Sequence, residues 1–309
     1  MQKQILISNG YRPVLLFNFL FLFLLLCLIG GPHRLVTGQQ STNLSGVPVA
    51  VYTGGHSDEN LASRTALIHL LEWLDADLTL LSPEGVLNGS LDEQAMFVMP
   101  GISPYTLRDE MTPVCYDIIR NFIASGGAYI GIYGGTFFEW THFELFNIEL
   151  QNYLPELPAG KNLVTVNIHK NGTGPDLSAL PNSYQILSWT GSYFDAPDMS
   201  HVTTIASYAL NDLPCMVSFR YGSGAVFLSS PHPEIEEGDI RDGTTFQDGL
   251  NDPDSEWNLM RIIACWLIDT ARVTPSNPNP IFVVTLAIVS IIVIVIVASV
   301  LYWKRLRVK

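Results

Sequence analysis

The chain has 309 residues, of which 48% are hydrophobic and 15% are charged, and its formal net charge is −13. That length holds one good-sized domain together with membrane segments, and it excludes an arrangement of several domains. When the basic residues of the first 38 and the last six positions are set aside, residues 39–303 carry a net charge of −20. So acidic a segment has no basic patch, which argues against nucleic acid as a partner.

The first predicted element is a secretory signal peptide over residues 1–38. Lys3 and Arg12 precede an apolar run over residues 14–29, and Val36 and Gly38 fit the −3 and −1 places of a cleavage site. A retained signal anchor is the alternative, although the run is near the lower limit for spanning a bilayer. Residues 39–46 follow as a polar leader.

Strands and helices are then predicted to alternate, which is typical of a parallel sheet with helices on both faces. Such sheets place their sites beyond the carboxyl ends of the strands. We therefore expect the glycine-rich loops at that edge to contact a ligand, and the residues concerned are Gly54, Gly55, Pro100, Gly101, Gly134 and Gly135. Buried strands are predicted at 47–52, 77–81, 94–99 and 128–132, and helices at 57–74 and 113–125.

The second half of the chain is predicted to add strands and one closing helix. The strands are expected at 163–168, 184–187, 202–208, 215–220 and 225–230, with a hairpin-like turn at 221–224 and a helix at 256–272. Residues 234–256 hold nine carboxylates against one arginine, Arg241. A calcium-binding loop is one interpretation, but the spacing fits no EF-hand pattern, so a solvated acidic loop is favoured.

Residues 126–140 read as a buried strand, a sharp glycine-bounded turn and the start of a helix, which is the form of a nucleophile elbow. The residue lifted above the sheet edge is Tyr133. Acyl-transfer enzymes place Ser or Cys there. The alternative is an ordinary glycine-rich turn with a packed aromatic side chain.

His232 and Glu234 lie two positions apart after the last predicted strand, in a turn fixed by prolines. If Tyr133 faces them, His232 is placed as a general base that Glu234 orients and stabilises. Backbone N–H groups near Gly101 and Gly134 then suggest an oxyanion hole.

These motifs resemble the class I glutamine amidotransferase-like fold, and most closely the N-terminal domain of fungal biotin-protein ligases and its secreted relatives. The resemblance covers residues 47–272 and rests on residues 51–55, 98–101, 126–135, 221–224 and 232–234. It implies an α/β fold of three layers, with a mostly parallel, flavodoxin-like sheet between two layers of helices. It also maps the family's catalytic cysteine, histidine and glutamate onto Tyr133, His232 and Glu234.

A tyrosine in the cysteine's place removes the thiolate that would form a glutamyl thioester, and no Gly-Arg-Gly-Arg-type biotin-binding motif is present. We therefore expect a catalytically defective domain that binds a small ligand or a protein partner. One alternative is an active hydrolase or acyltransferase that uses Tyr133, as sialidase-type glycosidases do, or a water activated by His232. Another is a structural or adhesive ectodomain without a functional pocket. No cofactor or metal is expected.

The C-terminal part predicts a single-pass type I membrane protein. A proline-rich stalk at 273–280 precedes residues 281–303, which contain no charge and are long enough to span a bilayer. The basic tail at 304–309 is expected in the cytoplasm and the ectodomain outside the cell or in the lumen. Sequons at Asn43, Asn88 and Asn171 favour the same topology.

Outside the signal region the chain has three cysteines, which permit at most one internal disulfide. Their neighbours are apolar and no metal-ligand spacing is present. Buried structural cysteines are therefore expected at Cys115, Cys215 and Cys265.

Overall fold

The computed structural model describes residues 42–138, 149–151, 160–170, 174–189, 192–195, 200–238, 240–252 and 254–272. The predicted signal peptide (1–38), stalk (273–280), membrane-spanning segment (281–303) and basic tail (304–309) lie outside these residues. Among the helices that the structure describes, none combines the length and the apolar character needed to cross a membrane.

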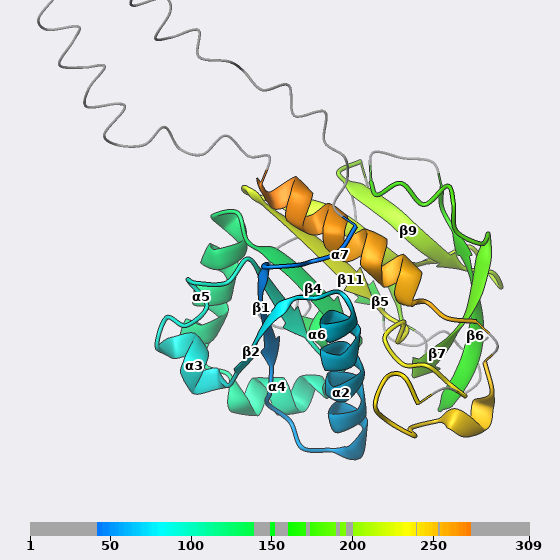
Figure 1. The fold of residues 1–309 in the computed structure, drawn as a ribbon, viewed down its shortest axis with the longest axis horizontal. Helices are drawn as coiled ribbons and strands as arrows, with labels where there is room; N and C mark the ends of the chain where they lie inside the picture. The colour runs from blue at the N-terminus through cyan, green and yellow to red at the C-terminus, as the bar shows by residue number, and fades with distance from the viewer. Residues whose placement is uncertain are drawn as a thin grey trace, which may run out of the picture. The chain divides into compact units, whose positions relative to one another are not determined.

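Nine strands form one sheet in the order β2-β1-β3-β4-β11-β10-β9-β6-β7 (Figure 1). A separate pair, β5 (Glu149–Gln151) and β8 (Tyr193–Asp195), forms a small antiparallel sheet. The strands of the large sheet are β1 (Pro48–Tyr52), β2 (Asp77–Leu81), β3 (Met96–Met99), β4 (Ala128–Ile132), β6 (Lys161–Ile168), β7 (Ser183–Trp189), β9 (Val202–Tyr208), β10 (Pro214–Tyr221) and β11 (Gly224–Ser229).

Half of the large sheet departs from the expected, mostly parallel arrangement. Strands β2, β1, β3, β4 and β11 pair in parallel, whereas β11, β10, β9, β6 and β7 pair antiparallel. The reason lies in the connections, because a parallel pair needs a crossover of a dozen or more residues. Residues 209–213 between β9 and β10, and residues 222–223 between β10 and β11, are too short for one.

Two layers of helices cover the sheet, as the three-layer prediction requires. On one face, α2 (Asp58–Trp73) and α7 (Trp257–Arg272) pack in the same core as Val49 and Val51 of β1. On the other, α3 (Pro83–Leu87), α4 (Pro104–Glu110) and α5 (Pro113–Ala124) pack in the same core as Ala50 and Tyr52. Alternate residues of a strand point to opposite faces, so β1 contributes to both cores. Figure 1 shows α7 lying across β4 and β11.

Helix α2 starts where local chemistry favours a start. Ser57 caps it by accepting a hydrogen bond from the Asn60 N–H at 3.3 Å, and two acidic residues, Asp58 and Glu59, occupy the first turn. The buried face of the helix includes two polar side chains, Asn60 and Ser63. Both lie near the carboxyl edge of the parallel strands, where the predicted site residues meet.

The cysteines agree with the sequence prediction. Cys115, Cys215 and Cys265 are all buried and none of them forms a disulfide. Burial raises the pKa of the Cys265 thiol to about 11 and raises that of Cys215 still further above its usual value. They therefore serve as core side chains.

Candidate functional site

Tyr133 stands on the turn between β4 and α6 (Gly134–Phe138) with φ at 44°, a left-handed conformation that is uncommon outside glycine. Its N–H donates to the Ser229 carbonyl at 2.7 Å, and its own carbonyl accepts from the Thr136 N–H at 2.8 Å. The next residue has to be glycine, because a Cβ on Gly134 would lie 1.3 Å from the Ile102 carbonyl oxygen. The strand-turn-helix of a nucleophile elbow is therefore present.

Strand pairing brings the elbow to the histidine and the glutamate. Strands β4 and β11 are adjacent and parallel, and Ile132 pairs with Ser229, so the segments that follow both strands leave the sheet side by side. His232 and Glu234 lie in the segment after β11. Their side chains are 0% exposed, and His232 Nδ1 lies 2.9 Å from Glu234 Oε1.

Ser63 of α2 connects the His232–Glu234 pair by hydrogen bonds to the loop that follows β3. Its hydroxyl donates to Glu234 Oε1 at 2.6 Å and accepts from the Gly101 N–H at 2.7 Å. The backbone N–H of His232 donates to the Leu187 carbonyl at 2.8 Å. One hydrogen-bonded network thus fixes the orientation of the imidazole, and the Gly101 N–H predicted for an oxyanion hole already has a partner.

The second ring nitrogen of His232, Nε2, has no hydrogen-bond partner among the described residues. Among the described residues, neither His232 Nε2 nor Glu234 Oε2 has a hydrogen-bond partner, although both atoms are buried. Buried polar atoms are nearly always hydrogen-bonded in folded proteins. With Nδ1 bound to the carboxylate, Nε2 is the atom through which His232 can accept a proton from, or bind, a second group.

Aromatic rings surround the imidazole. The ring centroid of Tyr133 lies 5.4 Å from that of His232, and the ring of Trp189 lies 4.8 Å from it, edge-on. Trp189 in turn lies 5.4 Å from Phe246. Tyr133 therefore lies beside the histidine.

Lys161 lies against two of these aromatic rings, Trp189 and Phe246. Lys161 Nζ lies 4.7 Å from the Trp189 ring and 4.6 Å from the Phe246 ring, and it pairs with Glu59 of α2 at 3.1 Å. Lys161 and Trp189 are cross-strand partners at one end of β6 and β7. Lys161 and Trp189 thus come from the antiparallel half of the sheet, Glu59 from α2 and Phe246 from the loop between β11 and α7.

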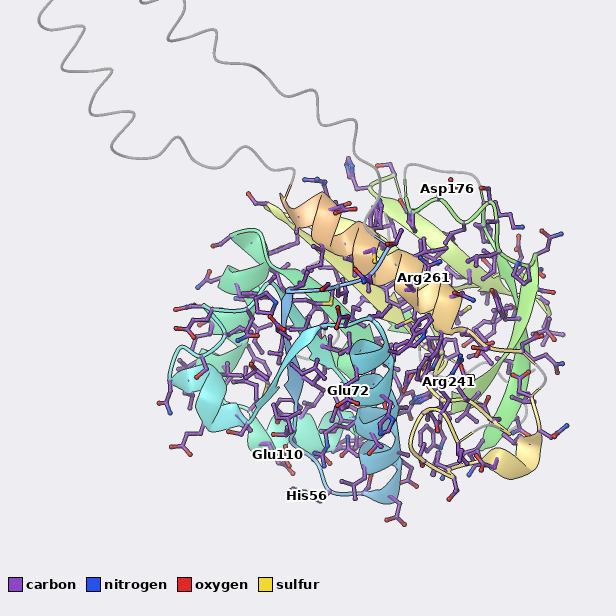
Figure 2. The ribbon with its side chains drawn as sticks, viewed as in Figure 1. His56, Glu72, Glu110, Asp176, Arg241 and Arg261 are labelled. Carbon is purple, nitrogen blue, oxygen red and sulfur yellow. The ribbon has the colours of Figure 1, made fainter. Side chains whose placement is uncertain are left out.

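The first glycine-rich loop holds a carboxylate of the chain itself. The Gly55 N–H lies 3.0 Å from both carboxylate oxygens of Glu110, and the Tyr52 hydroxyl donates to Oε2 at 2.9 Å. Burial, followed by this hydrogen bond, raises the pKa of Tyr52 well above its usual value. Figure 2 shows Glu110 beside the loop that carries His56. A Cβ on Gly54 would lie 2.1 Å from Glu110 Oε2, so the glycine makes room for this contact.

The remaining glycines of the predicted site pack closely against neighbouring backbone and side-chain atoms. A Cβ on Gly135 would lie 2.9 Å from the Met99 carbonyl oxygen, and one on Gly101 would lie 2.4 Å from His232 Cε1. Pro100 is buried beside them. These positions shape the edge of the sheet around His232.

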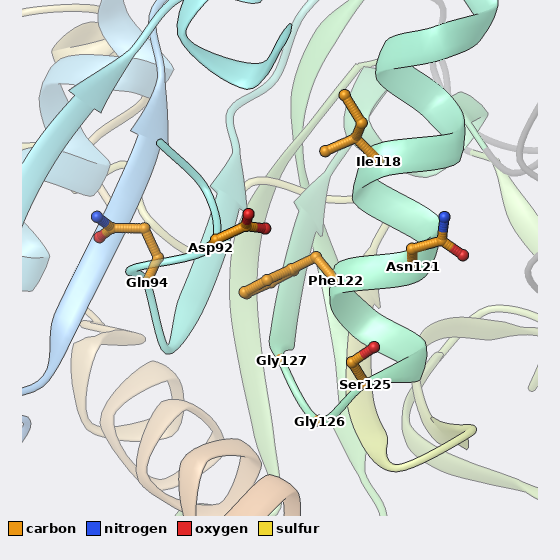
Figure 3. A pocket seen from close by; sticks show the side chains of 8 residues that line it. All are labelled: Asp92, Gln94, Ile118, Asn121, Phe122, Ser125, Gly126 and Gly127. Carbon is orange, nitrogen blue, oxygen red and sulfur yellow. The ribbon is translucent and has the colours of Figure 1, made fainter. Parts of the chain in front are cut away.

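A pocket of about 500 Å³ lies elsewhere, at the amino-terminal ends of β3 and β4 (Figure 3). Parallel strands have their amino and carboxyl ends at opposite edges, so this pocket is at the other edge from His232. It is lined by Asp92, Gln94, Ile118, Asn121, Phe122, Ser125, Gly126 and Gly127.

The acidic segment at 234–256 is not the solvated loop that its composition suggests. Glu234, Glu236, Glu237, Asp242 and Glu256 are all buried. No group of three His, Cys, Asp or Glu side chains within the described ranges is arranged to hold a metal ion. Of the three sequons, Asn43 and Asn88 are exposed, and Asn171 lies outside the described residues.

Several residues around His232 and Glu234 were not predicted from the sequence. The apolar residues near Ser63 do not mark its buried position, because Leu61, the first leucine of the helix, is 38% exposed. The buried stripe runs instead through Asn60, Ser63, Leu67 and Leu70. Polar residues that continue an apolar helical spacing were the available signal. Trp189, Phe246, Lys161 and Glu110 carried no comparable signal.

Comparisons with known proteins give partial matches. No family model matches the chain. An uncharacterized protein of Chlamydia muridarum is 31% identical over 134 residues, which are 38% of this chain and 51% of that protein. The chain thus spans about half the length of this curated relative.

Solved structures with a similar arrangement of the chain include glutamine amidotransferases. One from Thermotoga maritima has a TM-score of 0.47 at 15% identity, over 73% of this chain and 90% of its own. One from Methylobacillus flagellatus has a TM-score of 0.46 at 13% identity, over 74% and 95%. A β-galactosidase from Bacillus circulans reaches 0.44 at 13% identity, over 75% and 32%.

Proposed function

We propose that the chain is a single-pass membrane protein whose ectodomain binds a small ligand at the His232–Glu234 pair and does not turn it over. The proposal takes from the sequence the signal peptide, the membrane span and the resemblance of residues 47–272 to the biotin-protein ligase N-terminal domain. It takes from the geometry a buried acid–base pair that lies beside an aromatic ring.

The position of Tyr133 supports this function most directly. The elbow holds the residue at φ 44°, and its ring lies 5.4 Å from the imidazole of His232. Transfer through a thioester needs a small thiolate there, with open space for the substrate carbonyl. A phenol ring takes up part of that space and is a weak nucleophile at its ordinary pKa of about 10. Binding can persist where covalent transfer does not.

The surroundings of His232 indicate the chemistry of the ligand. Nε2 offers one hydrogen-bonding position that has no partner among the described residues. Trp189 and Tyr133 offer flat apolar surfaces, and Lys161 carries a positive charge beside the Trp189 ring. A small planar carboxylate or amide matches all three features.

A thermal-shift screen of the full-length chain in detergent tests the proposal, with small amides, esters and γ-glutamyl compounds as probes. A compound that binds the folded state only raises the thermal midpoint, and at 100 times its Kd it stabilises by about 2.7 kcal/mol. We expect at least one probe to raise the midpoint of the wild type and of Tyr105→Ala, a control at a tyrosine that is 70% exposed. The rise should be lost in Tyr133→Ala. If no probe acts, or if Tyr133→Ala responds like the wild type, the proposal is contradicted.

An active hydrolase or acyltransferase is the second candidate, and the unpartnered Nε2 of His232 favours it. An imidazole whose Nδ1 is held by a carboxylate is arranged as a general base. It would act on a water molecule or on the Tyr133 hydroxyl. Turnover that disappears in His232→Ala would support this candidate against the binding function.

A further inference from the structure

The imidazole of His232 is closed off from solvent. The side chains of His232 and Glu234 are 0% exposed, and Nε2 of the histidine is a buried atom without a hydrogen-bond partner among the described residues. A molecule that reaches Nε2 therefore has to displace part of the protein. The rings of Tyr133 and Trp189 lie against the imidazole, with centroids 5.4 and 4.8 Å from it.

Tyr133 and Trp189 differ in how firmly their backbone is held. The Tyr133 N–H donates to the Ser229 carbonyl at 2.7 Å, and the next residue, Gly134, packs tightly against backbone. Trp189 is instead the last residue of β7, which is the strand at one end of the large sheet (Figure 1). Trp189 is therefore the ring that can move away with less loss of contacts.

The ends of β6 and β7 form a two-stranded ribbon beyond the rest of the sheet. Strand β6 pairs with β7 over residues 161–167, but among the described strands it pairs with β9 only over residues 166–168. The first residues of β6 thus have a neighbouring strand on one side. A two-stranded ribbon by itself is marginally stable in water, and local opening takes place where contacts are few.

The side chain of Lys161 ties the end of this ribbon to the rest of the protein. Its Nζ pairs with Glu59 Oε1 at 3.1 Å and lies 4.7 and 4.6 Å from the ring centroids of Trp189 and Phe246. In the described part of the chain, this is the one ion pair between the antiparallel strands and α2. The two side chains are 27% and 41% exposed, so solvent and salt weaken the pair.

We propose that the end of this ribbon, residues 161–162 and 188–189, is a flap that closes over His232 and that its ion pair with α2 holds closed. Opening turns the flap about Leu187, whose carbonyl accepts from the backbone N–H of His232 at 2.8 Å. The tryptophan ring then leaves the imidazole, and Nε2 is exposed. That this opening admits a ligand rests on the proposed function, whereas the opening itself does not.

The reactivity of His232 toward diethyl pyrocarbonate tests the flap without any ligand. The reagent modifies an unprotonated imidazole nitrogen that solvent can reach, and peptide mass spectrometry measures the rate for each histidine. The full-length chain in detergent is used. We expect His232 to react far more slowly than His56, which is exposed and serves as the reference within the same chain.

Two variants remove the ion pair in different ways. Lys161→Met keeps a long side chain and should raise the rate at His232 about three- to tenfold, the size expected when a partly exposed ion pair and a contact of a cation with aromatic rings are lost. Glu59→Gln should raise it less, because the lysine keeps its contacts with the rings. Salt should accelerate the wild type more than either variant. Asp117→Asn is the matched control, since it breaks an exposed ion pair of α5, with Arg120 at 2.8 Å, and should leave the rate unchanged.

Alkylation of Cys215 by iodoacetamide separates opening of the flap from unfolding, because this thiol is fully buried in the core. We expect it to stay unmodified in every variant. The proposal is overturned if His232 of the wild type reacts as fast as His56, if Lys161→Met leaves the rate unchanged, or if Asp117→Asn raises it equally. It is also overturned if Cys215 is alkylated together with the modification of His232. A ligand screen without a hit contradicts the proposed function but does not alter these rates, so the two fail separately.

Discussion

Tyr133 adopts a backbone conformation that costs free energy in an isolated peptide, and the surrounding residues enforce it. A non-glycine residue in a sparsely populated region costs about 1–3 kcal/mol. At Tyr133 the compensation comes from the hydrogen bond to Ser229 and from the close contact of Gly134 with the Ile102 backbone. Residues of this kind are concentrated at functional sites, which is why the elbow bears on function.

The contact at Gly134 leads to a direct prediction. In Gly134→Ala the new methyl group would meet the Ile102 backbone, which cannot move aside as a side chain can. We expect the free energy of unfolding to fall by about 3 kcal/mol, the upper end of the range for overpacking. Urea denaturation measures it. Gly249→Ala is the control, because nothing lies within 4 Å of a Cβ there, and an equal loss in both variants would contradict the account.

At the residue scale, the sequence is enough to name a candidate site residue where the motif is local. Tyr133 sits within a run of glycines, and His232 and Glu234 lie two positions apart, so short spacings identified them. Ser63 lies 171 positions from its partner Glu234, and the contact depends on how α2 packs against the sheet. Such a pairing is fixed by tertiary packing and leaves little trace in a single sequence.

At the scale of elements, the bounds of strands and helices could be predicted from the sequence, whereas the order of the strands could not. Hydrophobic period and turn residues placed β2, β9 and α5 within a residue or two of their observed bounds. The hairpin-like turn at 221–224 indicated the antiparallel pair of β10 and β11, but the sequence did not reveal that β11 has the parallel strand β4 on its other side. Strand order is set by contacts between distant segments, which a local pattern does not contain.

The acidic segment gives a prediction about pH at the same scale. Folding raises the pKa of Glu237 to about 8 and that of Asp252 to about 6, so the folded chain holds these protons more tightly than the unfolded chain does. Stability then falls as pH rises from about 5 to about 8. Thermal midpoints measured across that range should decrease, and the decrease should be smaller in Glu237→Gln. A wild-type midpoint that rises over this range would contradict the prediction.

For the whole molecule, the three described cysteines test the packing of both cores. Cys115 lies in one core and Cys215 and Cys265 in the other. We expect iodoacetamide to leave all three unmodified in the folded chain and to alkylate all three after unfolding in denaturant, without a reductant. Peptide mass spectrometry reads both states. A disulfide between any two, or alkylation of the folded chain, would show that the packing differs.

The membrane topology is also a property of the whole molecule. Asn88 is exposed on the turn after α3, so an oligosaccharide fits there without disturbing the core. If the ectodomain passes through the secretory pathway, the chain expressed in eukaryotic cells should carry an N-linked glycan at Asn88 that an endoglycosidase removes and that Asn88→Gln lacks. A chain without N-glycans in such cells would argue against the predicted orientation.

The measurement that bears most directly on the central claim is turnover of the amide, ester and γ-glutamyl probes by the full-length chain, compared between the wild type and His232→Ala. The account holds that a phenol stands where this type of elbow otherwise carries a thiol, so the His232–Glu234 pair binds without transferring a group. It predicts no product above the uncatalysed rate for either protein. Product formed by the wild type and abolished in His232→Ala would contradict it.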